Sequence, residues 1–231
     1  GIVSASVSGS DISGKSYSGT DSINFTIDNS NPTLAILKPT GTYTNQSVVV
    51  TLTYDEAVTG LTTETSQFSE ATNIASLTLL SVSSDFKTYA IRITPNSDGF
   101  VKLTHAPNSP PAKDLAGNPI SSVVSCSFIY DTTSPTVTLT DTDSDNIVSG
   151  SNVVTITATF SESIAATPTI NIIGEVTNAI MTATSSSSVW IYPWTVSTTT
   201  SGIVSATVSG IDLAGNAYSR TDSLTFTIDN T

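Results

Sequence analysis

Residues 1–30 read GIVSASVSGSDISGKSYSGTDSINFTIDNS, and residues 202–231 read GIVSATVSGIDLAGNAYSRTDSLTFTIDNT. The two stretches are identical at 20 of 30 positions without a gap. A sequence that returns in this way indicates one structural unit repeated along the chain. Repeat arrays act mainly through their length, stiffness and surface, so the repeat argues against an enzyme.

The composition is typical of β-strands. Ser and Thr number 38 and 40 of the 231 residues, and charged residues make up only 11%. Short segments alternate apolar and polar residues and are separated by Gly, Pro, Asn, Asp and Ser, which predicts antiparallel strands with one buried face. The alternation is clearest in two segments whose apolar faces are Val48, Val50, Leu52 and Tyr54, and Val154, Ile156, Ala158 and Phe160.

Three related phrases mark the boundaries between units. Their aspartates, Asp28, Asp131 and Asp229, are 103 and 98 residues apart, which is the size of one seven-stranded immunoglobulin-like sandwich. Prolines after the first two phrases, Pro32 and Pro135, stiffen the connections. The predicted fold class is therefore all-β, with tandem immunoglobulin-like β-sandwiches forming an elongated rod.

The predicted domains are residues 30–130 and 131–231, preceded by a half-domain hairpin at residues 1–29. This hairpin supplies only the last two strands of a sandwich and would be marginal alone. Two explanations stay open: the chain was cut from a longer one, or strands of a neighbouring copy complete the half-domain. For the last domain we expect strands at residues 135–140, 152–160, 167–173, 177–184, 189–196, 203–209 and 223–228.

Net charge limits the partners. With a formal net charge of −12 and seven basic residues, the chain repels nucleic acid and anionic membrane surfaces and attracts divalent cations. The sequence contains no apolar stretch of about 20 residues, so we do not expect direct membrane insertion. The single cysteine, Cys126, excludes an intrachain disulfide and takes the place of Leu224 in the matching strand, so we expect it in a core.

Acidic residues occur at three matching connections in each full unit. In a seven-stranded antiparallel sandwich the incoming linker, the loop after the second strand and the loop before the last strand lie at the same pole. Asparagines of the two DLAGN segments add amide oxygens, and the adjacent glycines permit tight turns. The predicted ligands are Asp28, Glu56 (beside Asp55), Asp114 and Asn118 for residues 30–130, and Asp131, Glu162, Asp212 and Asn216 for residues 131–231.

The ligand types favour calcium. Two carboxylates about 5 Å apart repel by about 3 kcal/mol at an effective dielectric of about 20, and a bound cation removes this cost. Oxygen ligands without His or Cys favour structural Ca²⁺ over transition metals. The alternative is that Asp and Asn of DLAGN only form a turn. The run DTDSDN, residues 141–146, lacks the Gly and Glu of an EF-hand loop and is expected to be a solvated loop, with a peripheral calcium site as the alternative.

Catalytic motifs are absent from the sequence. The only histidine, His105, aligns with Val208 of the other unit, so no histidine-based site can repeat, and we expect a hydrogen-bonded edge histidine. Phosphate loops, zinc motifs and dinucleotide fingerprints are also missing. Trp190 and Trp194 lie four residues apart on one strand face, which predicts core packing, with a carbohydrate platform as the alternative.

The segments SGSNVVTITATFSE and DLAGN and the IDNT-type linker resemble bacterial immunoglobulin-like repeats, the "Big" domains of large surface adhesins. The resemblance implies a non-enzymatic, extracellular extender at a cell surface or surface appendage, with calcium at domain junctions. Its partners would be neighbouring repeats or other copies in a filament, and the adhesive target stays unidentified. The alternatives are a filament subunit that polymerises by strand complementation, and a carbohydrate-binding module.

Overall fold

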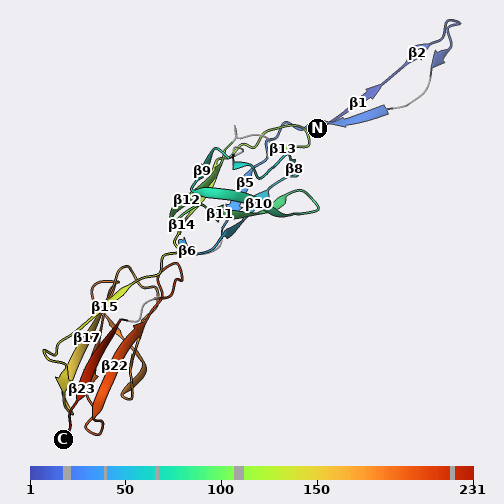
Figure 1. Ribbon diagram of the computed structural model, residues 1–231. Helices are drawn as coiled ribbons and strands as arrows, with labels where there is room; N and C mark the ends of the chain where they lie inside the picture. The colour runs from blue at the N-terminus through green and yellow to red at the C-terminus, as the bar shows by residue number, and fades with distance from the viewer. Residues whose placement is uncertain (18–21, 39–40, 66–67, 107–111, 219–221) are drawn as a thin grey trace. The chain divides into compact units, whose positions relative to one another are not determined.

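The computed structural model describes residues 1–231 except 18–21, 39–40, 66–67, 107–111 and 219–221 (Figure 1). The described residues form β-strands and connecting loops, with no α-helix among them. Within that part of the chain, no helix could cross a membrane. Internal contacts divide the chain into two compact units, residues 1–39, 48–94 and 102–126, and residues 40–47, 95–101 and 127–231. The predicted domain boundaries differ from this division and stay a prediction.

The N-terminal segment is an antiparallel hairpin. Strand β1 (Ile2–Ser6) pairs with β4 (Ser22–Thr26), and the short strands β2 (Gly9–Ser10) and β3 (Ser16–Tyr17) pair farther along the hairpin (Figure 1).

The strands between Leu34 and Tyr130 form two four-stranded sheets and one additional strand pair, which we call the first sandwich. One sheet has the order β10 (Ile74–Val82), β11 (Thr88–Pro95), β7 (Val48–Tyr54), β5 (Leu34–Leu37). The other has the order β6 (Tyr43–Thr44), β14 (Val124–Tyr130), β12 (Gly99–His105), β9 (Glu70–Thr72). Strand β8 (Val58–Thr59) pairs with β13 (Lys113–Asp114).

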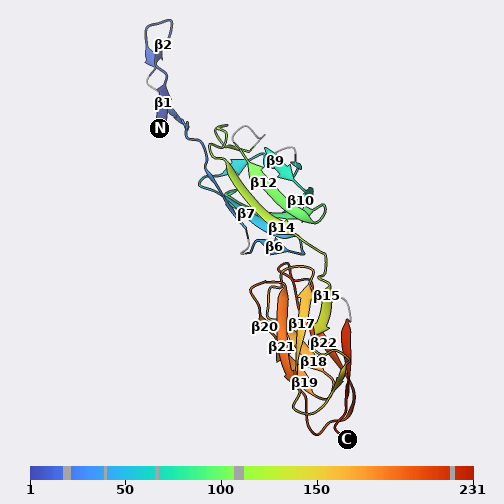
Figure 2. The same cartoon turned by 90° about the vertical axis from the view of Figure 1, so that its left-hand side faces the viewer.

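The strands between Val137 and Ile228 form the second sandwich (Figure 2). One sheet has the order β15 (Val137–Asp141), β17 (Val153–Phe160), β21 (Val189–Thr195), β20 (Thr182–Ala183). The other has the order β16 (Ile147–Val148), β23 (Ser223–Ile228), β22 (Gly202–Ser209), β18 (Thr169–Ile172), β19 (Val176–Ile180).

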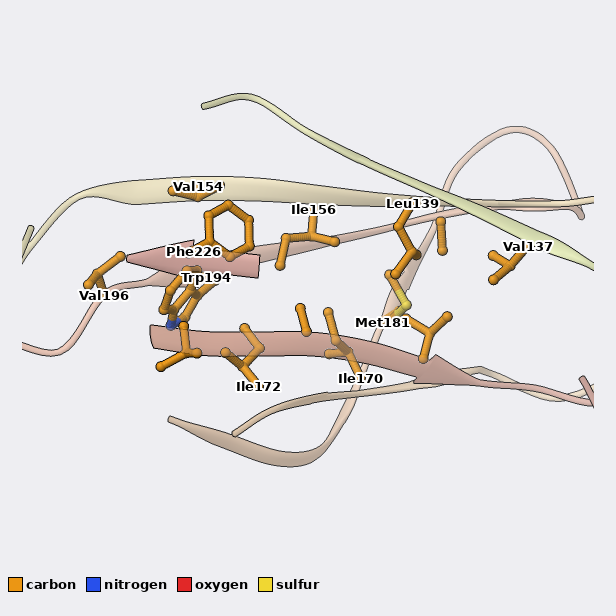
Figure 3. Close-up of a cluster of buried hydrophobic side chains, with 14 of the residues drawn as sticks. Val137, Leu139, Val154, Ile156, Ile170, Ile172, Met181, Trp194, Val196 and Phe226 are labelled. Carbon is orange, nitrogen blue, oxygen red and sulfur yellow. The ribbon is translucent and has the colours of Figure 1, made fainter. Parts of the chain in front are cut away.

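Alternating side chains build the core of the second sandwich, as the sequence predicts. On β17 the predicted apolar face is buried, from Val154 to Phe160, while the threonines between are more exposed. Residues from both sheets meet in one cluster, where the Trp194 ring lies 5.3 Å from the ring of Phe226 (Figure 3). Burial of this apolar surface is the main favourable contribution to folding.

The predicted strands of the second sandwich are present, with one division and one addition. The strand expected at residues 177–184 is two strands, β19 and β20, which belong to different sheets. Met181 lies between them, only 1% exposed, so the chain crosses from one sheet to the other around a buried side chain. The additional strand β16 pairs in parallel with β23, unlike the antiparallel pairs expected, and its Val148 is buried.

Cys126 is a free, buried cysteine on β14, as its alignment with Leu224 predicts.

His105 is also buried, but its surroundings differ from the prediction. Instead of a hydrogen-bonded edge histidine, the structure has an imidazole edge-on to Phe68 at 5.8 Å, and neither ring nitrogen has a hydrogen-bond partner among the described residues. Burial lowers the pKa of His105 below its usual value, because desolvation disfavours the charged form.

Candidate metal centre

The structure brings three predicted acidic residues together in each repeat. One carboxylate oxygen from each of Asp28, Glu56 and Asp114 lies within 4.8 Å of the other two. We call these residues the first acidic triad. The same criterion is met by the second acidic triad, which consists of Asp131, Glu162 and Asp212.

Matching connections supply the members of both triads. Asp28 follows β4 and Asp131 follows β14, where the chain leads into the next sandwich. Glu56 and Glu162 are each two residues beyond the ends of the matching strands β7 and β17. The sequence predicts this meeting because successive antiparallel strands return their ends to the same pole.

The DLAGN turn fixes the third carboxylate of the second triad. Asp212 is 1% exposed, and its Oδ1 accepts hydrogen bonds from the backbone N–H groups of Ala214 and Asn216, both at 2.8 Å. Gly215 has φ of 95°, a value that glycine adopts without strain. Backbone hydrogen bonds of the turn therefore hold the Asp212 carboxylate in position without a bound ligand.

The first triad has the same turn. Asn118 donates its backbone N–H to Asp114 Oδ1 at 2.7 Å, and Gly117 has φ of 95°. Burial acts to raise the pKa of Asp114, but hydrogen bonds from the Asn118 side chain and from the backbone N–H groups of the turn outweigh it, so that the pKa is lowered. The carboxyl group is thereby held in its charged form.

The two asparagines contact the triads through nitrogen. Asn118 Nδ2 donates to Asp114 Oδ2 at 2.7 Å and to the backbone oxygen of Asp28 at 3.0 Å. Asn216 Nδ2 donates to Asp212 Oδ2 at 2.8 Å and to the backbone oxygen of Asp131 at 2.9 Å. In the structure each asparagine thus orients the aspartate and ties the linker backbone to the turn. Its use as an oxygen ligand stays a prediction.

The glutamates are the triad members whose pKa values are raised. Burial raises the pKa of Glu56, and the charges of Asp28, Asp114 and Asp55 raise it further, against an opposing effect of Lys87. In the second triad, burial and then the charges of Asp131 and Asp212 raise the pKa of Glu162. These directions are expected when like charges gather without a counterion.

Asp55 does not join the first triad. Its carboxylate accepts hydrogen bonds from the backbone N–H and the hydroxyl of Thr33, both at 2.8 Å. Ser161 has the same place in the second sandwich, where its hydroxyl accepts from the backbone N–H of Thr136 at 2.9 Å. Both residues therefore hold the start of the first strand, and Glu56 and Glu162 are left as the acidic groups of this loop.

The triads suit a hard cation. The donors are carboxylate oxygens, which Ca²⁺ prefers at 2.3–2.6 Å, and a mutual separation within 4.8 Å allows the three oxygens to contact a single ion. An open pocket of about 390 Å³ lies beside the first triad, lined by Asp28, Glu56 and four neighbouring residues. The donor chemistry of the triads therefore fits Ca²⁺.

The other sequence candidates have local explanations. In DTDSDN, each aspartate accepts a backbone N–H two residues ahead: Asp141 from Asp143, Asp143 from Asp145, and Asp145 from Ile147. These bonds are turn interactions, as expected for a solvated loop. Trp194 is 1% exposed and Trp190 packs against the core, so Trp194 cannot stack on a sugar.

Asp98 is a linker-binding residue that sequence analysis missed. Its Oδ1 accepts hydrogen bonds from the backbone N–H and hydroxyl of Thr132, both at 2.9 Å, and its Oδ2 accepts from the Thr133 hydroxyl at 2.8 Å. Asn230 takes the aligned position of Thr132 and donates to the backbone oxygen of Ser197 at 3.0 Å. The two repeats use different side chains here, so no repeated motif marks the contact.

No protein-family model matches the chain, and no curated protein matches it by sequence. Membership of the bacterial immunoglobulin-like family thus stays a prediction.

Among solved structures, the chain is similar to a 1.5-MDa bacterial ice-binding adhesin, with 21% identity over 99% of this chain and 74% of that chain and a TM-score of 0.41. A tetra-tandem repeat from the extending region of a large adhesion protein has 19% identity over 100% of this chain and 57% of that chain, with a TM-score of 0.38. The Yersinia pseudotuberculosis adhesin InvE has 15% identity over 86% of this chain and 59% of that chain, with a TM-score of 0.30.

Proposed function

We propose that this chain is a non-enzymatic extender segment of an extracellular surface protein, an adhesin or a surface filament, and that each acidic triad binds one Ca²⁺ ion. The observation that carries the proposal is the recurrence of the same triad, on the same DLAGN turn, in both repeats. A catalytic centre needs one good site, whereas a structural device is repeated with the unit that it serves.

The position of the triads supports a role in fixing the linkers. Asp28 and Asp131 belong to the segments that lead into the sandwiches, while the remaining triad members belong to the sandwiches themselves. When bound, calcium supplies the positive charge that offsets the repulsion among the three carboxylates. An ion shared in this way ties each linker to the sandwich that follows it, in addition to the asparagine hydrogen bonds to the linker backbone.

The charge of the chain supports an extracellular setting for this function. A formal net charge of −12 favours divalent counterions, and extracellular calcium modules need only dissociation constants of about 10⁻⁴ to 10⁻³ M. At a free calcium concentration of about 100 times the dissociation constant, each ion would stabilise its folded sandwich by about 2.7 kcal/mol.

Small-angle scattering and thermal unfolding in calcium and in chelator test this proposal together. We expect chelation to lower the melting temperature and to broaden the distribution of interatomic distances, since the linkers become freer. A chain carrying both Glu56→Gln and Glu162→Gln is the matched control and should respond little to calcium. Identical melting and scattering of the unmodified chain in calcium and in chelator would contradict the proposal.

A further inference from the structure

The N-terminal hairpin has the same strand register as the last hairpin of the second sandwich. In β1 and β4, Val3 lies opposite Phe25. In β22 and β23, Val204 lies opposite Phe226, and these are the residues that align with Val3 and Phe25 in the repeat. The sequence repeat is therefore also a structural repeat.

The turns beyond these strands match as well. Asp11 aligns with Asp212, and its Oδ1 accepts the backbone N–H groups of Ser13 and Lys15, both at 2.9 Å. Asp212 accepts the corresponding N–H groups of Ala214 and Asn216. The hairpin thus contains the penultimate strand, the turn and the last strand of one repeat.

Burial is where the two hairpins differ. Val3, Phe25 and Ile27 are 46%, 50% and 49% exposed. Their counterparts Val204, Phe226 and Ile228 are 4%, 0% and 2% exposed. One face of the N-terminal hairpin therefore carries the apolar residues of a sandwich core without the rest of that core, and exposed apolar faces of this kind mark interaction surfaces.

The second sandwich shows what covers such a face. Strand β18 pairs with the free edge of β22, with Ile170 opposite Val208. On the other edge β16 pairs in parallel with β23, with Val148 opposite Ile228. The opposite sheet closes the core, where Trp194 contacts Phe226 (Figure 3).

We propose that the open face of the N-terminal hairpin is covered by strands with the sequence pattern of residues 135–201, joined directly ahead of Gly1 in the same polypeptide, so that the hairpin completes a further sandwich. Val7 would then lie opposite a residue matching Ile170, and Ile27 opposite one matching Val148. A second copy of this chain is the less suitable partner, because its strands β18 and β16 already pair with β22 and β23. Pairing of these strands with the hairpin does not require bound calcium.

The first test adds a copy of residues 131–201 ahead of Gly1 in the full chain. The added segment then meets Gly1 as Ser201 meets Gly202 in the natural sequence. We expect hydrogen exchange of the amides in residues 1–30 to slow by about 100-fold, since covered strands exchange only by opening the unit. The matched control carries Ile170→Asp and Ile172→Asp in the added copy only, at positions that are 0% exposed in the second sandwich, and should leave the exchange of residues 1–30 fast.

Unchanged exchange with the intact added segment would overturn the proposal. Slow exchange in the unextended chain that depends on protein concentration would also overturn it, by showing that a second copy covers the face.

A second test does not require the added segment to fold. Residues 202–231 of the full chain are replaced by the sequence of residues 1–30, with Asn216 retained. If the hairpin face fits strands of this pattern, the second sandwich should still fold cooperatively, with a melting temperature within about 10 °C of the parent. Loss of its unfolding transition would contradict the fit.

Discussion

Glu162→Gln should change the stability of the second sandwich in opposite directions without and with calcium. The substitution removes one negative charge from the second acidic triad and retains the size of the side chain. Glu162 is the appropriate member to change, because the oxygens of Asp212 also hold the DLAGN turn, whereas Asp131 belongs to the linker.

Without calcium the variant should be the more stable protein. Carboxylate oxygens within 4.8 Å of one another repel by about 3 kcal/mol per pair at an effective dielectric of about 20. Glu162 takes part in two such pairs, but it is partly exposed, and screening by solvent leaves a net relief of about 1 kcal/mol. For a sandwich of this size that corresponds to a melting temperature higher by about 4–8 °C.

With calcium the order should reverse. The unmodified triad gains about 2.7 kcal/mol at 100 times its dissociation constant, and the variant loses most of that gain with one of its three charged ligands. Differential scanning calorimetry in 5 mM EDTA and in a series of calcium concentrations, at about 0.15 M salt, measures both signs on one preparation.

Two matched variants make this experiment specific. Glu56→Gln should produce the same reversal in the first sandwich alone, and Glu64→Gln, which removes an exposed carboxylate outside both triads, should do neither. The reasoning is refuted if Glu162→Gln lowers the melting temperature equally in EDTA and in calcium, because the glutamate would then contribute to packing and not to charge.

Two further predictions concern His105 and Asn216. Burial lowers the pKa of His105 in the folded chain from 6.5. The neutral imidazole therefore contributes its full stabilisation above about pH 6.5, the unfolded pKa. Below that pH, the free energy of unfolding falls by about 1.4 kcal/mol per pH unit until the folded pKa is reached. His105→Val, which copies the aligned Val208, should therefore unfold in urea with a weaker loss of stability between pH 7.5 and 5.5; equal losses in the two proteins would contradict the buried neutral imidazole. Asn216→Ala removes donors to Asp212 and to the backbone oxygen of Asp131, and should lower the free energy of unfolding by about 1–3 kcal/mol even in EDTA. A loss that appears only in calcium would instead support Asn216 as a ligand.

Much of the fold could be predicted because local patterns decide it. Alternation placed Val154 to Phe160 on the buried face of β17, and a repeated sequence placed the hairpins. The division of residues 177–184 between two sheets was missed, because it depends on the room that other strands leave for Met181. The parallel partner of β23 was missed for a similar reason: two residues, Ile147 and Val148, are too few to show a pattern.

The triads could be predicted because topology alone brings their connections together. The orientation of Asn118 could not, because its nitrogen is directed by the backbone oxygen of Asp28, 90 residues away in sequence. The apolar surroundings of His105 also come from a distant residue, Phe68. Sequence therefore identified which groups meet, and only coordinates showed which atoms of those groups face each other.

The most direct test of the central claim is to measure calcium binding to the metal-free chain by isothermal titration calorimetry. Magnesium, titrated in the same way, is the comparison ion. Our account predicts two bound calcium ions per chain, one fewer for Glu56→Gln or Glu162→Gln under the same conditions, and weaker binding of magnesium. A titration that shows no saturable calcium binding to the unmodified chain at millimolar concentrations would contradict it.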